Sequence, residues 1–126
     1  MITVINVIGT RTAAHAARNL AELGAAYAAS PALAELGETN AQVTIEDPAS
    51  EISDETRKMI EDRLLGAILM PVTELVDEGL ATIEQIDLGA QHALKYGRAP
   101  GAILQELGDE PARNLVADFK AARGAA

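Results

Sequence analysis

Cysteine and tryptophan are absent from this chain of 126 residues, and aromatic residues make up only 2% of it. The lack of cysteine excludes a disulfide framework, a thiol nucleophile and a cysteine-based zinc site. With so few aromatic side chains, a core must consist of aliphatic residues and alanine. No apolar run approaches the roughly 18 residues that a membrane span needs, and the N-terminus lacks the basic and apolar regions of a signal peptide. These absences predict a soluble, cytoplasmic domain.

Basic residues are also scarce. The chain has 10 lysines and arginines against 19 aspartates and glutamates, which gives a net charge of −9. This balance argues against nucleic acid or an anionic membrane as a partner, because both attract basic surfaces. Residues 1–34 are nearly neutral and rich in alanine, whereas residues 46–87 carry the whole net charge. The chain therefore has a neutral front and an acidic middle.

Signals for helices are abundant. Alanine favours helices by its intrinsic propensity, and capping residues, prolines and glycines divide the chain into helical segments. Predicted starts are Thr10 or Thr12, Ser30-Pro31, Ser53, Thr82, Pro100 and Asp109, and the corresponding ends are Gly24, Gly37, Gly79, Gly97, Gly108 and Gly124. Thr82 and Gln85 have the spacing of a capping box.

Two short segments, Ile2–Ile8 and Val43–Ile45, have the composition of strands. One or two isolated strands cannot form a sheet, so the predicted fold class is all-α. The long helix after Ser53 has an aliphatic face at helical periodicity. Pro71 within this helix predicts a kink, because proline removes a backbone donor.

An internal echo links the two ends of the chain. Gly108 is followed by Ala-Arg-Asn-Leu at residues 112–115, and Gly9 is followed by the same four residues at 17–20. The glycines are 99 residues apart and the tetrapeptides 95, so one short insertion reconciles the two copies. The echo predicts that the front is the tail of one repeat and that the rest is nearly all of a second.

Gly9 invites comparison with a dinucleotide-binding turn. The fingerprint G-x-G-x-x-G would need glycines where the chain has Arg11 and Ala14. Arg11 would block the close backbone approach that a pyrophosphate requires. A turn before a helix is the better interpretation of Gly9.

Other residues suited to chemistry are few. His15 and His92 lie on predicted helices and have no metal-binding spacing around them. The acidic residues Glu74, Asp77 and Glu78 are more typical of a solvated helix face than of paired acid–base carboxylates. The sequence therefore predicts no catalytic, cofactor-binding or metal-binding residue.

Residues 63–108 carry a more specific pattern. An Arg-Leu-Leu run is followed by a helix that ends in Glu-Gly, then by an Ile-Asp pair, a glycine, and a Pro-Gly pair that leads to Leu-x-x-Leu-Gly. In order and spacing this stretch resembles the C-terminal helical domain of the 3-hydroxyacyl-CoA dehydrogenase family. The matching positions are Arg63, Leu64, Leu65, Glu78, Gly79, Ile86, Asp87, Gly97, Pro100, Gly101, Leu104 and Gly108.

The front of the chain, residues 5–36, resembles the tail of the same helical domain. The resemblance implies a helical bundle like these C-terminal domains, which are similar to that of 6-phosphogluconate dehydrogenase. It implies that residues 1–37 are the tail of a first repeat, residues 38–53 a linker and residues 54–126 a second repeat.

The departures from the family determine which copy is implied. The Rossmann domain, with its nucleotide site and catalytic His–Glu pair, is missing from the chain. Where the substrate-binding copy has an Asn before Arg-Leu-Leu and an Asn-Glu pair along the helix, this chain has Asp62, Met70 and Pro71. The resemblance therefore implies the second, non-catalytic copy, which packs against the first or forms the dimer interface.

On this resemblance we expect the C-terminal packing or dimerisation part of an NAD-dependent 3-hydroxyacyl-CoA dehydrogenase of fatty-acid β-oxidation, inactive on its own. NAD belongs to the parent family, and no cofactor is expected in this chain. The implied partner is the Rossmann domain of a dehydrogenase or a second copy in a homodimer. The expected interface residues are Leu64, Leu65, Ile68, Leu69 and Val72.

Two alternatives belong to other classes. The first is a stand-alone helical protein-interaction domain that kept the fold without the pathway. The second is a helical pocket that contacts acyl-CoA. The second is weaker, because a CoA phosphate site favours clustered arginines or lysines, and the basic residues here are scattered.

Overall fold

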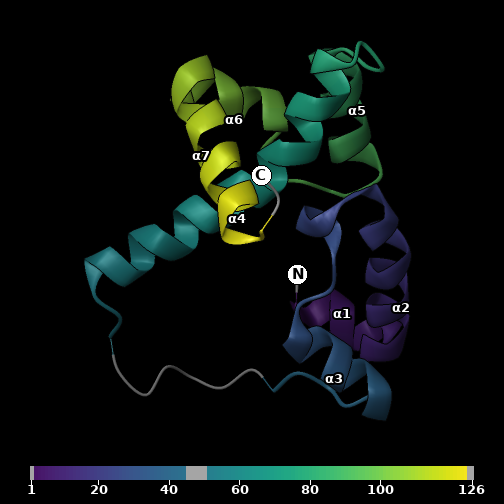
Figure 1. Cartoon of the computed structure of the whole chain (residues 1–126). Helices are drawn as coiled ribbons and strands as arrows, with labels where there is room; N and C mark the ends of the chain where they lie inside the picture. Colours follow the sequence, from purple (N-terminus) through teal and green to yellow (C-terminus); the bar gives the residue numbers. More distant parts are fainter. Residues whose placement is uncertain (1, 45–50, 125–126) are drawn as a thin grey trace. The chain divides into compact units, whose positions relative to one another are not determined.

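The computed structural model describes residues 2–44 and 51–124. Within these ranges the chain forms helices and contains no β-strand, which confirms the predicted all-α class. The chain divides into two compact units. Unit 1 comprises Met1–Glu51 with Arg123–Ala126, and unit 2 comprises Ile52–Ala122 (Figure 1). The division falls inside the predicted linker, residues 38–53.

Unit 1 is built from three short α-helices. They are α1 (Ile2–Ile8), α2 (Thr10–Leu20) and α3 (Pro31–Thr39), with two 3₁₀ helices, η1 (Ala21–Leu23) and η2 (Ala25–Tyr27), between the last two. Helix α3 packs along α2 (Figure 1). The Ser30 hydroxyl accepts a hydrogen bond from the Leu33 amide at 3.2 Å, which confirms the predicted cap of α3.

The strand prediction for Ile2–Ile8 is wrong, because this segment is helix α1. β-branched residues favour strands only weakly, and a helix pairs its own backbone groups where a lone strand leaves them unpaired. The backbone of Val43 instead pairs with a side chain. The Asn6 amide nitrogen donates to the Val43 carbonyl at 2.8 Å, and the Val43 amide donates to Asn6 Oδ1 at 2.8 Å. Val43 and Thr44 have no regular structure, and Ile45 lies outside the described residues.

Three helix boundaries in unit 1 differ from those predicted. The α-helix expected to end at Gly24 ends at Leu20, and η1 follows it to Leu23. Thr10 is the first residue of α2 rather than its cap, and its buried hydroxyl lies 2.8 Å from the Ala41 carbonyl. The position before α2 belongs to Gly9. Helix α3 continues through Gly37 and ends before Asn40, which adopts the left-handed conformation at φ 55°. Asparagine tolerates this conformation, so glycine was not needed to end the helix.

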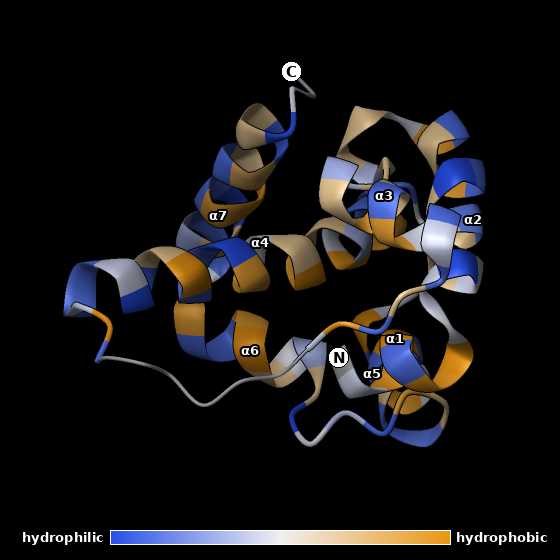
Figure 2. Cartoon of the chain, turned by 90° about the horizontal axis from the view of Figure 1, so that it is seen from below, coloured by the Kyte–Doolittle hydropathy of each residue, from blue (hydrophilic) through white to orange (hydrophobic). Residues whose placement is uncertain are grey.

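Unit 2 is built around the longest helix, α4 (Asp54–Asp77), with α5 (Ile83–His92), α6 (Pro100–Leu107) and α7 (Asp109–Ala122). Two of the three predicted side-chain caps are confirmed, and the third is wrong, because Asp109 is the first residue of α7 and Gly108 precedes it. Ser53 accepts from the Thr56 amide at 3.2 Å, and Thr82 and Gln85 form the capping box. Helix α4 continues past Pro71 to Asp77. The helices alternate between hydrophilic and hydrophobic segments along their length, as Figure 2 shows for α4 and α7.

Helix α5 ends earlier than the predicted stop at Gly97. Its last residue is His92, and Lys95 adopts the left-handed conformation at φ 55°. The Tyr96 amide donates to the Ala90 carbonyl at 3.0 Å, which closes the turn after the helix. The ends at Gly79 and Gly108 are as predicted. Gly108 directly follows α6, Gly79 lies one residue beyond the end of α4 at Asp77, and both glycines have positive φ.

A close contact between α4 and α7 organises unit 2. A Cβ on Gly66 would lie 2.6 Å from the Leu115 carbonyl oxygen and 2.8 Å from Phe119 Cβ. Only glycine therefore allows the two backbones to approach this closely. The buried apolar residues of unit 2 are aliphatic, as the composition predicts: Leu69, Met70, Val72, Ala90, Ala99, Ile103, Ala112 and Val116.

Candidate functional site

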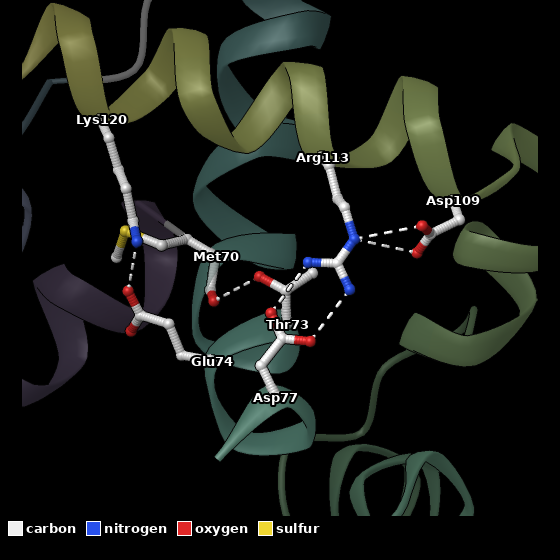
Figure 3. Close-up of polar contacts among 7 residues, drawn as sticks. All are labelled: Met70, Thr73, Glu74, Asp77, Asp109, Arg113 and Lys120. Carbon is white, nitrogen blue, oxygen red and sulfur yellow. Dashed lines mark hydrogen bonds and ion pairs between the residues drawn. The ribbon is translucent and has the colours of Figure 1, made fainter. Parts of the chain in front are cut away.

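A network of charged side chains joins the C-terminal end of α4 to α7 (Figure 3). The guanidinium of Arg113 donates from Nη1 and Nη2 to the two oxygens of Asp77, at 2.8 and 2.9 Å. Its Nε donates to both oxygens of Asp109, at 3.1 Å each. Arg113 thus holds one carboxylate from α4 and one from its own helix through the fork geometry typical of arginine.

A second ion pair joins the same two helices. Lys120 Nζ of α7 lies 2.6 Å from Glu74 Oε1 of α4. The Thr73 hydroxyl donates to the Met70 carbonyl at 3.0 Å, within α4 (Figure 3). Both helices therefore contribute charged groups of opposite sign to one surface.

The electrostatics of this network favour the charged forms of Asp77 and Arg113. Hydrogen bonds from Arg113 hold the pKa of Asp77 below its usual range. The hydrogen bond with Asp77, and after it the one with Asp109, raises the pKa of the Arg113 guanidinium. A lower pKa makes the Asp77 carboxylate a weaker base. The arrangement is suited to holding α4 and α7 together.

The sequence interpretation of Glu74, Asp77 and Glu78 as a solvated face was incomplete. All three are at least partly exposed, but Glu74 and Asp77 bind cations of α7. The four-residue spacing of Asp109 and Arg113 is a recognisable helix pair. The partner from α4 lies 36 residues away from Arg113, and no local signal in the sequence indicates it.

Two parts of the pattern that resembles the family meet between α5 and α6. The Asp87 carboxylate accepts a hydrogen bond from the Gly101 amide at 2.7 Å, at the beginning of α6. A Cβ on Gly101 would lie 2.4 Å from Asp87 Oδ2 and 3.0 Å from Ile83 Cγ1. The Ile-Asp and Pro-Gly pairs of the pattern therefore meet in the structure. Gly79, at φ 67°, forms the turn after α4.

The five predicted interface residues differ in accessibility. Leu69 and Val72 are buried, at 0% and 5% exposure. Leu65 and Ile68 are partly exposed. Leu64 is 51% exposed, so it is the member of the set that a partner reaches most easily.

The candidate chemical residues of the sequence do not form a site. His15 and His92 are exposed, on different units. In the described parts of the chain, no group of three or more His, Asp or Glu side chains is placed to hold a metal ion. None of the helices described is both long and apolar enough to cross a membrane.

The turn at Gly9, between α1 and α2, does not have the structure of a dinucleotide-binding turn. The segment before Gly9 is helix α1, whereas a dinucleotide turn follows a strand. A Cβ on Gly9 would lie 3.1 Å from Asn40 Oδ1, so the side chain of Asn40 already occupies the space beside the glycine. The Asn40 oxygen also accepts from the Arg11 amide, at 3.1 Å.

No family model matches this chain, and no curated protein and no solved structure matches it either.

Proposed function

We propose that this chain is a non-catalytic helical part of a 3-hydroxyacyl-CoA dehydrogenase-like protein, with a packing or dimerisation role. The observation that carries the proposal is the hydrogen bond of 2.7 Å between Asp87 and Gly101. It joins two separate parts of the sequence pattern that resembles this family. It gives those residue types a physical reason, since a side chain at residue 101 would collide with the carboxylate.

The middle of α4 supports a non-catalytic role. Met70 is 3% exposed and apolar, and Pro71 follows it. Catalytic copies of the resembled domain have polar groups at these positions. A buried thioether offers neither a proton nor a charge to a substrate.

The proposed contact surface centres on Leu64, with Leu65 and Ile68 beside it. The partner is the nucleotide-binding domain of a dehydrogenase of this type or a second copy of the chain. An exposed leucine on a long helix contributes to an interface by burial of its apolar area. Leu69 and Val72 support that surface from inside.

Two measurements test the proposal. The purified chain, with acetoacetyl-CoA and NADH, is expected to give no change in absorbance at 340 nm. In the second, the chain is titrated with the purified nucleotide-binding domain of a 3-hydroxyacyl-CoA dehydrogenase, and its own association state is measured by sedimentation. A complex or a dimer is expected, and Leu64→Lys is expected to weaken it about tenfold by placing a charge in the contact.

The matched control is Leu88→Lys, because Leu88 is 60% exposed but lies on α5. This control is expected to leave the association unchanged. Turnover that survives purification to homogeneity contradicts the non-catalytic role. A chain that stays monomeric and binds no nucleotide-binding domain contradicts the packing role.

A further inference from the structure

Unit 2 has a groove between the N-terminal half of α4 and helix α7. Two depressions of about 320 and 550 Å³ share the lining residues Lys58, Asp62, Leu115 and Asp118, and therefore adjoin. The end of α6 and the start of α7 complete the larger one. In Figure 1 the N-terminal part of α4 extends beyond α7.

The floor of the groove is apolar. It is formed by Met59, Leu65, Leu107, Leu115 and Phe119. Met59 is 54% exposed, and Phe119 is the only phenylalanine of the chain. Methionine and phenylalanine at an accessible surface are typical of sites that bind apolar side chains of a protein partner.

The rim of the groove is acidic. Glu55, Glu61, Glu110 and Asp118 line it, and none of these four carboxylates makes an ion pair within the described residues. Two cations, Lys58 and Arg63, also line the groove, against five carboxylates in all. Lys58 is held by Asp62, with Nζ 2.8 Å from Oδ2, and this contact raises the pKa of Lys58. The rim therefore has a surplus of negative charge that the unit does not neutralise itself.

We propose that this groove binds a basic, amphipathic helix of a partner protein. The apolar face of such a helix covers the floor, and its lysines or arginines pair with the free carboxylates of the rim. An elongated groove between two helices suits a third helix, which places anchors at i, i+3, i+4 and i+7 on one side. The acidic rim disfavours nucleic acid and the phosphates of CoA, because like charges repel.

This proposal goes beyond the dehydrogenase-like packing role and does not depend on it. Leu65 belongs to both surfaces, whereas Leu64, the centre of the proposed packing surface, and the rim carboxylates are not shared. A failure at Leu64 and a failure at the groove are therefore separate results.

The test uses a designed probe, a fluorescent peptide of leucine and lysine about four helical turns long with leucines on one face. Two control peptides accompany it, one with the same composition in scrambled order and one with glutamate in place of lysine. Anisotropy gives the affinity for the full chain, and amide chemical shifts give the location. The probe is expected to bind, to shift amides along Glu55–Leu65 and α7, and to bind more weakly as salt screens the rim.

Variants connect the binding to the groove. Neutralising three rim residues together, Glu61→Gln, Glu110→Gln and Asp118→Asn, is expected to weaken binding about tenfold. The matched control removes three exposed carboxylates outside the groove, Glu35→Gln, Glu78→Gln and Glu84→Gln, and is expected to change affinity less than about twofold. All six residues are exposed, so the fold is expected to remain intact.

Met59→Ser tests the floor, and Leu88→Ser is its control on another exposed apolar residue. The proposal is overturned if both charge triples weaken binding equally, if the scrambled or acidic peptide binds as well, or if no peptide binds. It is also overturned if the chain is a dimer whose groove amides are already protected, since the occupant would then be a second copy.

Discussion

The corners at Gly9 and Gly108 have the same backbone conformation but different surroundings. Gly9 joins α1 to α2 at φ 88° and ψ 136°, and Gly108 joins α6 to α7 at φ 84° and ψ 158°. They are the two glycines of the sequence echo. A Cβ on Gly9 would lie 3.1 Å from Asn40 Oδ1, whereas a Cβ on Gly108 would meet only Pro111 Cδ, at 3.8 Å. The sequence echo therefore coincides with a similar turn between two helices and not with similar contacts around it.

The two units also share a glycine at a contact between helices, next to each of these two turns. The helix after the corner packs against a helix that carries a glycine at the contact: α2 meets Gly37 of α3, and α7 meets Gly66 of α4. In unit 1 the glycine-bearing helix follows the corner in sequence, and in unit 2 it precedes the corner. Close backbone approach is thus common to both units, although the order of the helices differs.

The largest effect is expected from substitution of the corner glycines. A residue with a Cβ in this backbone region costs about 1–3 kcal/mol, so Gly108→Ala is expected to destabilise unit 2 by about 2 kcal/mol. Gly9→Ala is expected to destabilise unit 1 by about 3 kcal/mol, because Asn40 must also move. Amide hydrogen exchange measures the free energy of unfolding of each unit. A smaller loss at Gly9 than at Gly108 would show that the surroundings do not matter.

The contact at Gly66 is expected to give the next largest effect. Its neighbours are a backbone carbonyl and a Cβ, which cannot rotate away, so Gly66→Ala must separate α4 from α7. Overpacking minus the gain in helix propensity leaves a loss of about 1–2 kcal/mol in unit 2. Gly89→Ala is the control, because residue 89 is helical with no atom within 4 Å of its added Cβ. Chemical denaturation is expected to show that this control is more stable than wild type by about 0.5–1 kcal/mol. If both substitutions stabilised the chain, Gly66 would not be a contact.

A substitution at Gly37 is expected to be compensated by a second substitution more easily than one at Gly66. A Cβ there would lie 2.4 Å from Ala14 Cβ, so Gly37→Ala is expected to cost unit 1 about 1 kcal/mol. The double variant Gly37→Ala with Ala14→Gly exchanges the two residues across the contact. We expect it to lose less stability than the two single variants together, as measured by a double-mutant cycle in thermal unfolding. If the losses of stability in the two single variants simply added up in the double variant, the contact with Ala14 would not be the cause of the loss in Gly37→Ala.

Among the described residues of unit 1 no ion pair corresponds to those of unit 2. The effect of the unit 2 pairs on stability is expected to be the smallest. Because the pKa of Asp77 is lowered in the folded state, its contribution is present above the unfolded value of about 3.9 and is lost as the pH falls through the folded value. The substitution Asp77→Asn is therefore expected to make the free energy of unfolding of unit 2 depend less on pH in the acidic range. Solvent around the half-exposed pair limits the effect. Thermal unfolding between neutral and acidic pH measures it, with Glu78→Gln as control. An equal change in the control would mean that general charge, not Arg113, is responsible.

Local signals predicted most of the fold, and the errors arose where a local signal was ambiguous. Ser30, Ser53 and Thr82 cap helices through atoms three residues away, so the sequence displays both partners. Helix α1 was missed because its β-branched composition resembles a strand. The end of α3 was missed because Asn40, not Gly37, takes the left-handed conformation.

The candidate surfaces were less predictable. The exposed Leu64 was on the expected interface, but burial separates it from Leu69 and Val72, and burial depends on all four helices of unit 2. The groove combines residues from α4, α6 and α7 that are up to 64 residues apart, from Glu55 to Phe119. Periodicity within one helix cannot indicate which other helix will complete such a surface.

The close approach at Gly66 also constrains how the sequence can drift over generations. Every single substitution there adds atoms against the main chain of α7, so no gradual route leads to a larger residue without a simultaneous change in α7. Gly89 and Gly97, which face open space, carry no such constraint. In descendants of this chain we expect glycine to be retained at residue 66 and to be replaced freely at residues 89 and 97. Retention of glycine at one position would then mark where two helices lie close together.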